Sequence, residues 1–167
     1  MLGIDGRKVP TRSAHAILNS LFQSGGVICA KQTMIYHEDL LEEAGLLVDF
    51  FKEDFRHKTY MQQLIAYHDE AQLEVTKSET IFKIFRHDGT EEAIKKSKED
   101  ATLAKEEAEQ GGEFWSTVTE GNQCHYIAYC KGADLIKKAV DLTSEKFKLK
   151  VPLAVEYIIG RNWEECH

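Results

Sequence analysis

A short acidic turn, Tyr67-His68-Asp69-Glu70, lies between two apolar runs of strand-like composition. The runs cover residues 61–66 and 71–76, so the turn is the predicted tip of a β-hairpin. Hard divalent cations such as Mg²⁺ take oxygen ligands and keep several waters, so one or two protein carboxylates are enough to hold one. The adjacent carboxylates of Asp69 and Glu70 therefore predict a site that holds a divalent cation against a phosphate.

A second group of polar residues, His15, Asn19 and Gln23, recurs at every fourth position. On a continuous helix this spacing places the three side chains in one stripe. Their donors and acceptors suit contacts with bases and sugars, and the minor groove presents nearly the same acceptors for every base pair. The stripe fits a surface that grips any correctly paired duplex, although the spacing alone favours an ordinary solvated helix face.

The composition excludes several broad classes of protein. The 167 residues are 43% hydrophobic and 29% charged, which is ordinary for one globular domain. The sequence has no apolar run of about 18 residues and no signal-peptide pattern. We therefore expect a cytoplasmic protein without membrane contact.

The net charge of −7 argues against nucleic-acid binding over the whole surface. The charge is uneven, however. Residues 1–33 contain four basic residues and one acidic residue, whereas residues 86–113 contain five basic and nine acidic residues. The N-terminal part can therefore face a polyanion.

The cysteines are few and form no pair of C-x-x-C motifs, so we expect reduced thiols. They are Cys29, Cys124, Cys130 and Cys166. A zinc site assembled from Cys124-His125, Cys130 and Cys166-His167 is the alternative, although its spacing matches no standard zinc motif.

The local patterns predict an α+β fold. Helices are expected over residues 13–22 and 27–44, with a break at Ser24-Gly25-Gly26 and an end at Gly45. Further helices are expected over 81–85, 86–110 and 133–147, and strands over 114–118, 125–129 and 151–159. We expect one antiparallel sheet, made of the Asp69 hairpin and the last strand and backed by the helices at 13–44 and 133–147.

Several motifs, in this order, resemble the C-terminal part of the palm of family A DNA polymerases, the DNA polymerase I class, and phage replicative polymerases most closely. They are Asp5-Gly6-Arg7-Lys8, the helix with Leu18-Asn19-x-x-x-Gln23, the His68-Asp69-Glu70 hairpin, and the tail ending Asn162-Trp163-x-x-Cys166-His167. The resemblance covers about residues 3–82 and 131–167. It implies a palm-type sheet with palm parts at 1–82 and 131–167 and an inserted segment at 83–130.

The resemblance also implies a role for each candidate site residue. Asp69 would be one of two aspartates that hold a pair of Mg²⁺ ions, which stabilise the attacking and leaving oxygens of nucleotidyl transfer. His68 would lie beside the primer terminus, and Glu70 would shape the site. The remaining candidates would contact DNA: His15, Asn19 and Gln23 in the minor groove of the primer–template, and Arg7 and Arg12 near its backbone.

Two parts of a family A polymerase are missing from this sequence: the other metal aspartate and the fingers helix that receives the incoming dNTP. One aspartate cannot hold two Mg²⁺ ions tightly, so we expect the chain to be inactive alone. It would act with an N-terminal polymerase fragment that supplies both parts. A naturally split polymerase and an excised fragment both fit, and the Met start and the unmatched 83–130 segment favour the split gene.

Two other functions remain open at this point. A palm-like module could bind DNA or a replication protein without chemistry, although such a module has no need of the His68-Asp69-Glu70 turn. A small phosphohydrolase could use Asp69 and Glu70 with His68 as the base, but the sequence offers no second carboxylate motif at a suitable spacing. The 83–130 segment could dock a partner, repel DNA or be solvated filler.

Overall fold

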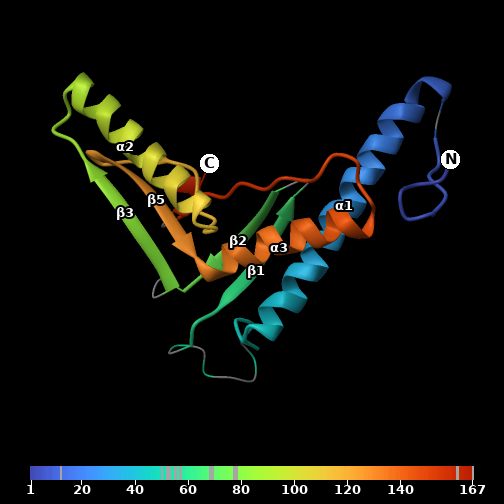
Figure 1. Cartoon of the computed structure of the whole chain (residues 1–167). Coiled ribbons are helices and arrows are strands. Elements are labelled where there is room, and N and C mark those ends of the chain that lie inside the picture. The colour runs from blue at the N-terminus through green and yellow to red at the C-terminus, as the bar shows by residue number, and fades with distance from the viewer. Residues whose placement is uncertain are drawn as a thin grey trace. The chain divides into compact units, whose positions relative to one another are not determined.

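The structure is a computed structural model, and it describes residues 1–11, 13–49, 51, 54, 56, 58–67, 70–76, 79–160 and 162–166. Its described elements are α-helices, short 3-10 turns and two small antiparallel sheets, so the predicted α+β class is confirmed (Figure 1). They are η1 (Ala14–Ala16), α1 (Ile17–Glu43), β1 (Met61–Tyr67), β2 (Glu70–Val75), β3 (Thr80–Arg86), α2 (Glu91–Gln110), β4 (Thr119–Gly121), β5 (Cys124–Cys130), α3 (Lys131–Lys146) and η3 (Trp163–Cys166).

The chain divides into two compact units. The first unit contains Met1–Val75 and Leu135–Ala154, and the second contains Thr76–Asp134 and Val155–His167. The first unit holds the predicted duplex-contacting stripe and the hairpin, and the second holds the whole 83–130 segment predicted to be an insertion. No helix in the described part of either unit is long and apolar enough to cross a membrane.

Helix α1 runs without interruption through Gly25 and Gly26, so the predicted break is wrong. Each glycine costs a helix about 1 kcal/mol relative to alanine, but tertiary packing of the later turns outweighs this cost. Those turns bury Cys29, His37, Leu40 and Leu41. The helix therefore extends as one rod from the polar stripe to the core.

All three helices end in the same hydrogen-bonded motif. After α1, the N–H groups of Gly45 and Leu46 donate to the carbonyl oxygens of Glu42 and Leu41 at 2.9 and 2.8 Å. This is the Schellman arrangement, which needs a left-handed residue after the helix. The left-handed residues are Gly45 (φ 68°), Gly112 (φ 88°) and Lys148 (φ 51°). The predicted end at Gly45 is confirmed.

The first unit packs α1 against α3 beside the β1–β2 hairpin. The Thr33 hydroxyl of α1 donates to the Thr143 hydroxyl of α3 at 3.0 Å, and the Lys146 ammonium donates to the Gln32 side-chain oxygen at 2.6 Å. The predicted hairpin is confirmed, since β1 and β2 pair antiparallel with Tyr67 opposite Glu70 and a bulge between Gln63 and Ile65. The buried side chains of this unit are Cys29, His37, Leu40, Leu41, Leu46, Val48, Met61, Ala139, Val140 and Thr143.

The second unit is a three-stranded antiparallel sheet in the order β3-β5-β4, with α2 lying on it (Figure 1). β3 occupies residues for which a helix was predicted, and that prediction is wrong. Its β-branched and aromatic side chains favour a strand, and all seven of its residues pair with β5. The predicted helices at 86–110 and 133–147 are confirmed as α2 and α3.

Two further strand predictions are wrong within the described residues: neither 114–118 nor 151–159 forms a ladder. The 151–159 run is extended, and its side chains alternate between exposed and half-buried. It does not join the β1–β2 sheet. Pro152 lacks an amide donor. The backbone of this run is held instead by isolated hydrogen bonds, such as the one from Thr117 N–H to the Tyr157 carbonyl oxygen at 2.9 Å.

Two glycine substitutions in the region of α1 separate backbone strain from helix propensity. Gly45→Ala forces a β-carbon into the left-handed region, so we expect unfolding to become easier by about 1–2 kcal/mol. Gly25→Ala adds a methyl group where no atom lies within 4 Å, so we expect about 1 kcal/mol of stabilisation. Urea unfolding followed by circular dichroism measures both, and a neutral Gly45→Ala would contradict the strain assignment.

Candidate functional site

The hairpin predicted to hold a divalent cation is present, and the two residues that join its strands are His68 and Asp69. Both lie outside the described residues, so their assigned roles stay predictions. Glu70 is the first residue of β2 and is exposed, and its carboxylate accepts a hydrogen bond from the Gln72 amide at 3.0 Å. The tip therefore offers a carboxylate to solvent on an arm fixed by antiparallel pairing.

The polar stripe lies on an exposed helical face, as its spacing predicted. His15 belongs to η1, Asn19 and Gln23 belong to the first turns of α1, and all three are exposed. Leu18 and Phe22 fall on the same face by their spacing, and they are 65% and 72% exposed. The sequence interpretation missed these two apolar residues, although the i, i+3 and i+4 pattern that includes them was readable.

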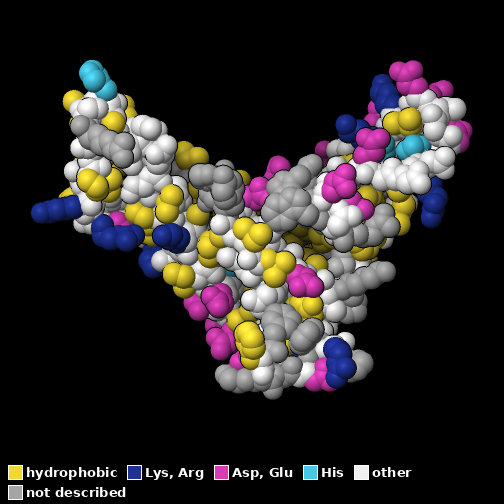
Figure 2. Space-filling model, turned by 180° about the vertical axis from the view of Figure 1, so that it is seen from behind, with side chains coloured by type: hydrophobic (Ala, Val, Ile, Leu, Met, Phe, Trp, Pro, Cys, Tyr) yellow, Lys and Arg dark blue, Asp and Glu magenta, His cyan; other side chains and the backbone are white. Residues whose placement is uncertain are grey.

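Figure 2 shows hydrophobic side chains interspersed with charged ones at the surface. On α1 the large exposed hydrophobic residues are Ile17, Leu18, Phe22, Val27 and Ile35. Single exposed apolar residues are normal, but a cluster usually marks a contact surface. The face that carries the stripe is thus part polar and part apolar.

The N-terminal basic residues predicted to approach the DNA backbone are partly described. Arg7 is exposed and pairs with Asp5 through its side chain, and its backbone N–H donates to the same carboxylate at 3.2 Å. Desolvation opposes the shift, but the hydrogen bonds and charge of Arg7 lower the pKa of the Asp5 carboxyl. Arg7 would therefore have to share or leave Asp5 to contact a phosphate. Arg12 lies outside the described residues.

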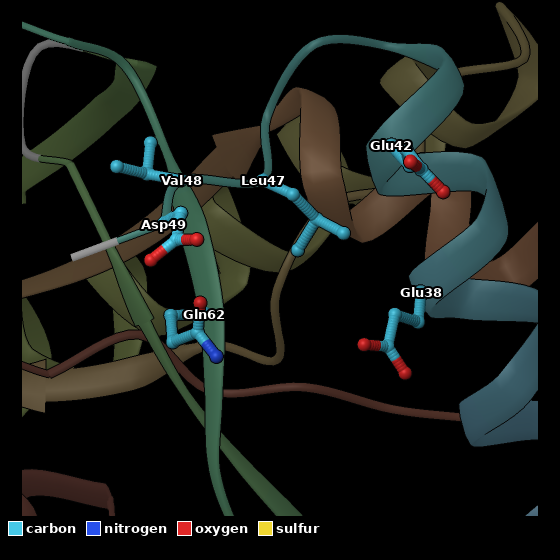
Figure 3. Close-up of a pocket in the computed structure, with 6 residues that line it drawn as sticks. All are labelled: Glu38, Glu42, Leu47, Val48, Asp49 and Gln62. Atoms are coloured by element: carbon cyan, nitrogen blue, oxygen red, sulfur yellow. The ribbon is translucent and has the colours of Figure 1, made fainter. Parts of the chain in front are cut away.

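An open acidic depression lies in the first unit, lined by Glu38 and Glu42 of α1, by Leu47, Val48 and Asp49, and by Gln62 of β1 (Figure 3). Three carboxylates there disfavour a polyanion. Nowhere in the described part of the chain do three or more His, Cys, Asp or Glu side chains lie close enough to hold a metal ion. We interpret the depression as a solvated acidic surface.

The alternative zinc site does not assemble among the described residues. Cys124 and Cys130 are both even-numbered positions of β5, whereas His125 is odd-numbered and points to the other face of the sheet. Cys130 is 2% exposed, and burial raises the pKa of its thiol, with the N–H groups of Ala133 and Gly132 acting against the shift. The described cysteines are free, and His167 lies outside the described residues.

Two curated proteins match part of the chain. They are the DNA-directed DNA polymerases of Escherichia phage T7 and Enterobacteria phage T3, each 52% identical to it over 44 residues. The match covers 26% of this chain and 6% of either polymerase, so the chain matches only a small part of their length. No protein-family model and no solved structure matches the chain. One segment of the chain is thus related to a segment of phage DNA-directed DNA polymerases.

The stripe should contribute little to the free energy of unfolding, because its side chains are already exposed to solvent in the folded protein. Replacing His15, Asn19 and Gln23 by alanine should change the free energy of unfolding by less than about 0.5 kcal/mol per residue. Leu41→Ala, at a position 2% exposed in the core, should cost about 2–5 kcal/mol. Urea unfolding compares the variants, and a strongly destabilised triple variant would show that the stripe is structural.

Proposed function

We propose that this chain is the C-terminal palm part of a phage-type family A DNA polymerase, acting in template-directed nucleotidyl transfer from dNTP to a primer. The observation that carries the proposal is the 52% identity over 44 residues to two phage DNA-directed DNA polymerases. The hairpin with an exposed Glu70 and the exposed polar stripe support it, since both belong to the first unit.

The carboxylates of Asp69 and Glu70 suit Mg²⁺, because carboxylate oxygens are the ligands that this ion prefers. Asp69 would hold the ion. When bound there, Mg²⁺ would neutralise the charge that develops on the oxygens of the transferred phosphoryl group. Glu70, whose carboxylate accepts a hydrogen bond from the Gln72 side-chain amide at 3.0 Å, would supply a second carboxylate that shapes the site. His68 would lie beside the primer terminus.

The stripe would position the primer–template. Amide and imidazole groups can donate to or accept from the minor-groove edge without regard to sequence. Asn19 and Gln23 lie one turn apart on a continuous helix, so they can follow successive base pairs. The exposed Arg7, with Arg12, would add phosphate contacts that fix the register.

A partner chain would complete the enzyme. Two-metal catalysis needs a second aspartate and a site for the incoming nucleotide, and no second carboxylate motif at a suitable spacing is present in this sequence. The exposed Ile17 and Ile35 of α1, on the face away from the stripe, are the kind of apolar surface that an N-terminal polymerase fragment would cover.

Primer extension tests the catalytic proposal. The chain is co-expressed with the polymerase-like product of a neighbouring reading frame, and extension is measured with and without Mg²⁺. We expect extension only with both chains, and a loss of at least about a thousandfold in Asp69→Ala. Glu106→Ala, which removes an exposed carboxylate of α2, should leave the rate unchanged.

If Asp69→Ala extends primers as well as the parent, the catalytic proposal fails. Duplex binding without extension would then favour the non-catalytic DNA- or replication-protein-binding module. Cleavage of a simple phosphodiester by the chain alone would favour the phosphohydrolase.

Duplex affinity tests the stripe separately from catalysis. Asn19→Ala and Gln23→Ala should each weaken binding of a primer–template about threefold to tenfold, because each removes one hydrogen-bonding side chain. The loss should be the same for any duplex sequence, since the minor groove is nearly uniform in its acceptors. Fluorescence anisotropy measures it, with the exposed Gln110→Ala as the matched control. If all three variants bind the primer–template with the affinity of the parent, the stripe does not contact the duplex.

A further inference from the structure

Helix α2 is held on the sheet of the second unit by few buried contacts. Of its 20 residues, only Ser97 and Ala101 are buried. Ser97 and His125 of β5 are both 4% exposed, and the Ser97 hydroxyl lies 2.5 Å from His125 Nδ1. Because Ser97 and Ala101 are small, they bury little apolar area. The Ser97–His125 hydrogen bond is a buried polar contact that joins α2 to β5, beside the half-buried Ile94.

A second imidazole faces His125. The ring of His87, just after β3, lies with its centroid 5.7 Å from that of His125. Both ring nitrogens of His87 are buried and have no hydrogen-bond partner among the described residues. A neutral imidazole always carries one N–H, and a buried unpaired donor destabilises the state that contains it. The buried ring nitrogens of His87, unpaired within the described part of the chain, therefore destabilise the folded arrangement in which α2 lies on the sheet.

The charges around the pair disfavour protonation of His125. Burial lowers the pKa of His125, and the charges of His87 and Lys98 lower it further. Glu120, directly opposite His125 on β4, acts against them. On the other side, Asp88 has its pKa lowered chiefly by hydrogen bonds from Thr90 and to a small extent by His87. Glu120 therefore offsets part, but not all, of the cost of a charged His125.

We propose that Ser97 and His125, with His87 beside them, form an acid-sensitive latch, which holds α2 on the sheet while His125 is neutral and releases it when His125 is protonated. A protonated His125 lies close to Lys98 and to the His87 ring, whose centroid is 5.7 Å away, and it is desolvated while Ser97 of α2 covers it. Release would uncover Ile127, which lies on the same face of β5 as His125 and is fully buried.

The direction of the pH dependence follows from proton binding. Released α2 leaves His125 in water with an ordinary pKa of about 6.5, whereas the latched form binds the proton more weakly. The released form therefore gains protons as the pH falls below about 6.5, and acid shifts the equilibrium toward it. Above that pH the latch is complete.

Amide hydrogen exchange of the full chain, read by mass spectrometry and corrected for the intrinsic rate at each pH, tests the latch. Between pH 6.5 and 5 we expect protection of residues 91–110 to fall by about tenfold per pH unit for each proton gained on release. Peptides from β3 and β5 should keep their protection. Protection of α2 that does not change with pH, or an equal loss in all peptides, would overturn the proposal.

Matched variants assign the effect to these side chains. His87→Gln with His125→Gln should abolish the pH dependence of α2, and His15→Gln in the first unit should retain it. Ser97→Ala should lower protection at every pH without changing the slope, since it removes the hydrogen bond and no charge. If the double variant does not fold, His87→Gln alone should raise α2 protection at pH 5. A parent-like fall in the double variant, or an unchanged His87→Gln, would contradict the latch.

Discussion

Strand β5 is the constraint on which the second unit depends. It is the central strand, paired with β3 on one side and β4 on the other, and Ile127 and Ala128 at its middle are fully buried. Its backbone also forms hydrogen bonds with the two segments that contain no strand, 114–118 and 151–159. The Ala128 carbonyl oxygen accepts hydrogen bonds from Ser116 N–H at 2.8 Å and from the Tyr157 hydroxyl at 2.9 Å. Burial is the main cause that raises the pKa of Tyr157 far above its ordinary value. Helix α2 packs on β5 together with β3, and the tail reaches β5 through the Tyr157 hydroxyl.

In the first unit, the two ends of α1 differ in burial: the later turns are packed in the core and the early turns are exposed. The later turns of α1 supply core residues such as Leu41, whereas its early turns carry the exposed Asn19 and Gln23, and the exposed His15 of η1 precedes them. Sequence can therefore change at the exposed end with little effect on folding. Among these residues lies Phe22, an apolar side chain that is 72% exposed.

The sequence predicted secondary structure correctly where the pattern of apolar and polar residues followed one clear helical or strand period. The hairpin followed from two strand-like runs around a polar turn, and α2 and α3 from long helical compositions. It failed for β3, where Ile81, Phe82 and Ile84 are apolar on both faces and give no clear period. The break at Gly25 failed because distant packing outweighed local propensity. The Ser97–His125 contact joins residues 28 positions apart, so no local pattern could predict it. The assignments of Arg12, His68 and Asp69 stay predictions.

The most direct measurement of the proposed role is photocrosslinking to a primer–template in the assembled two-chain complex. A photoreactive phenylalanine analogue replaces Phe22, which lies among the stripe residues, or Ile35, which is 54% exposed on the opposite face of α1. The account predicts crosslinks from position 22 to duplex DNA within a few base pairs of the primer terminus, and none from position 35. Equal crosslinking from both positions, or none from position 22, would contradict a role for this face in gripping the primer–template.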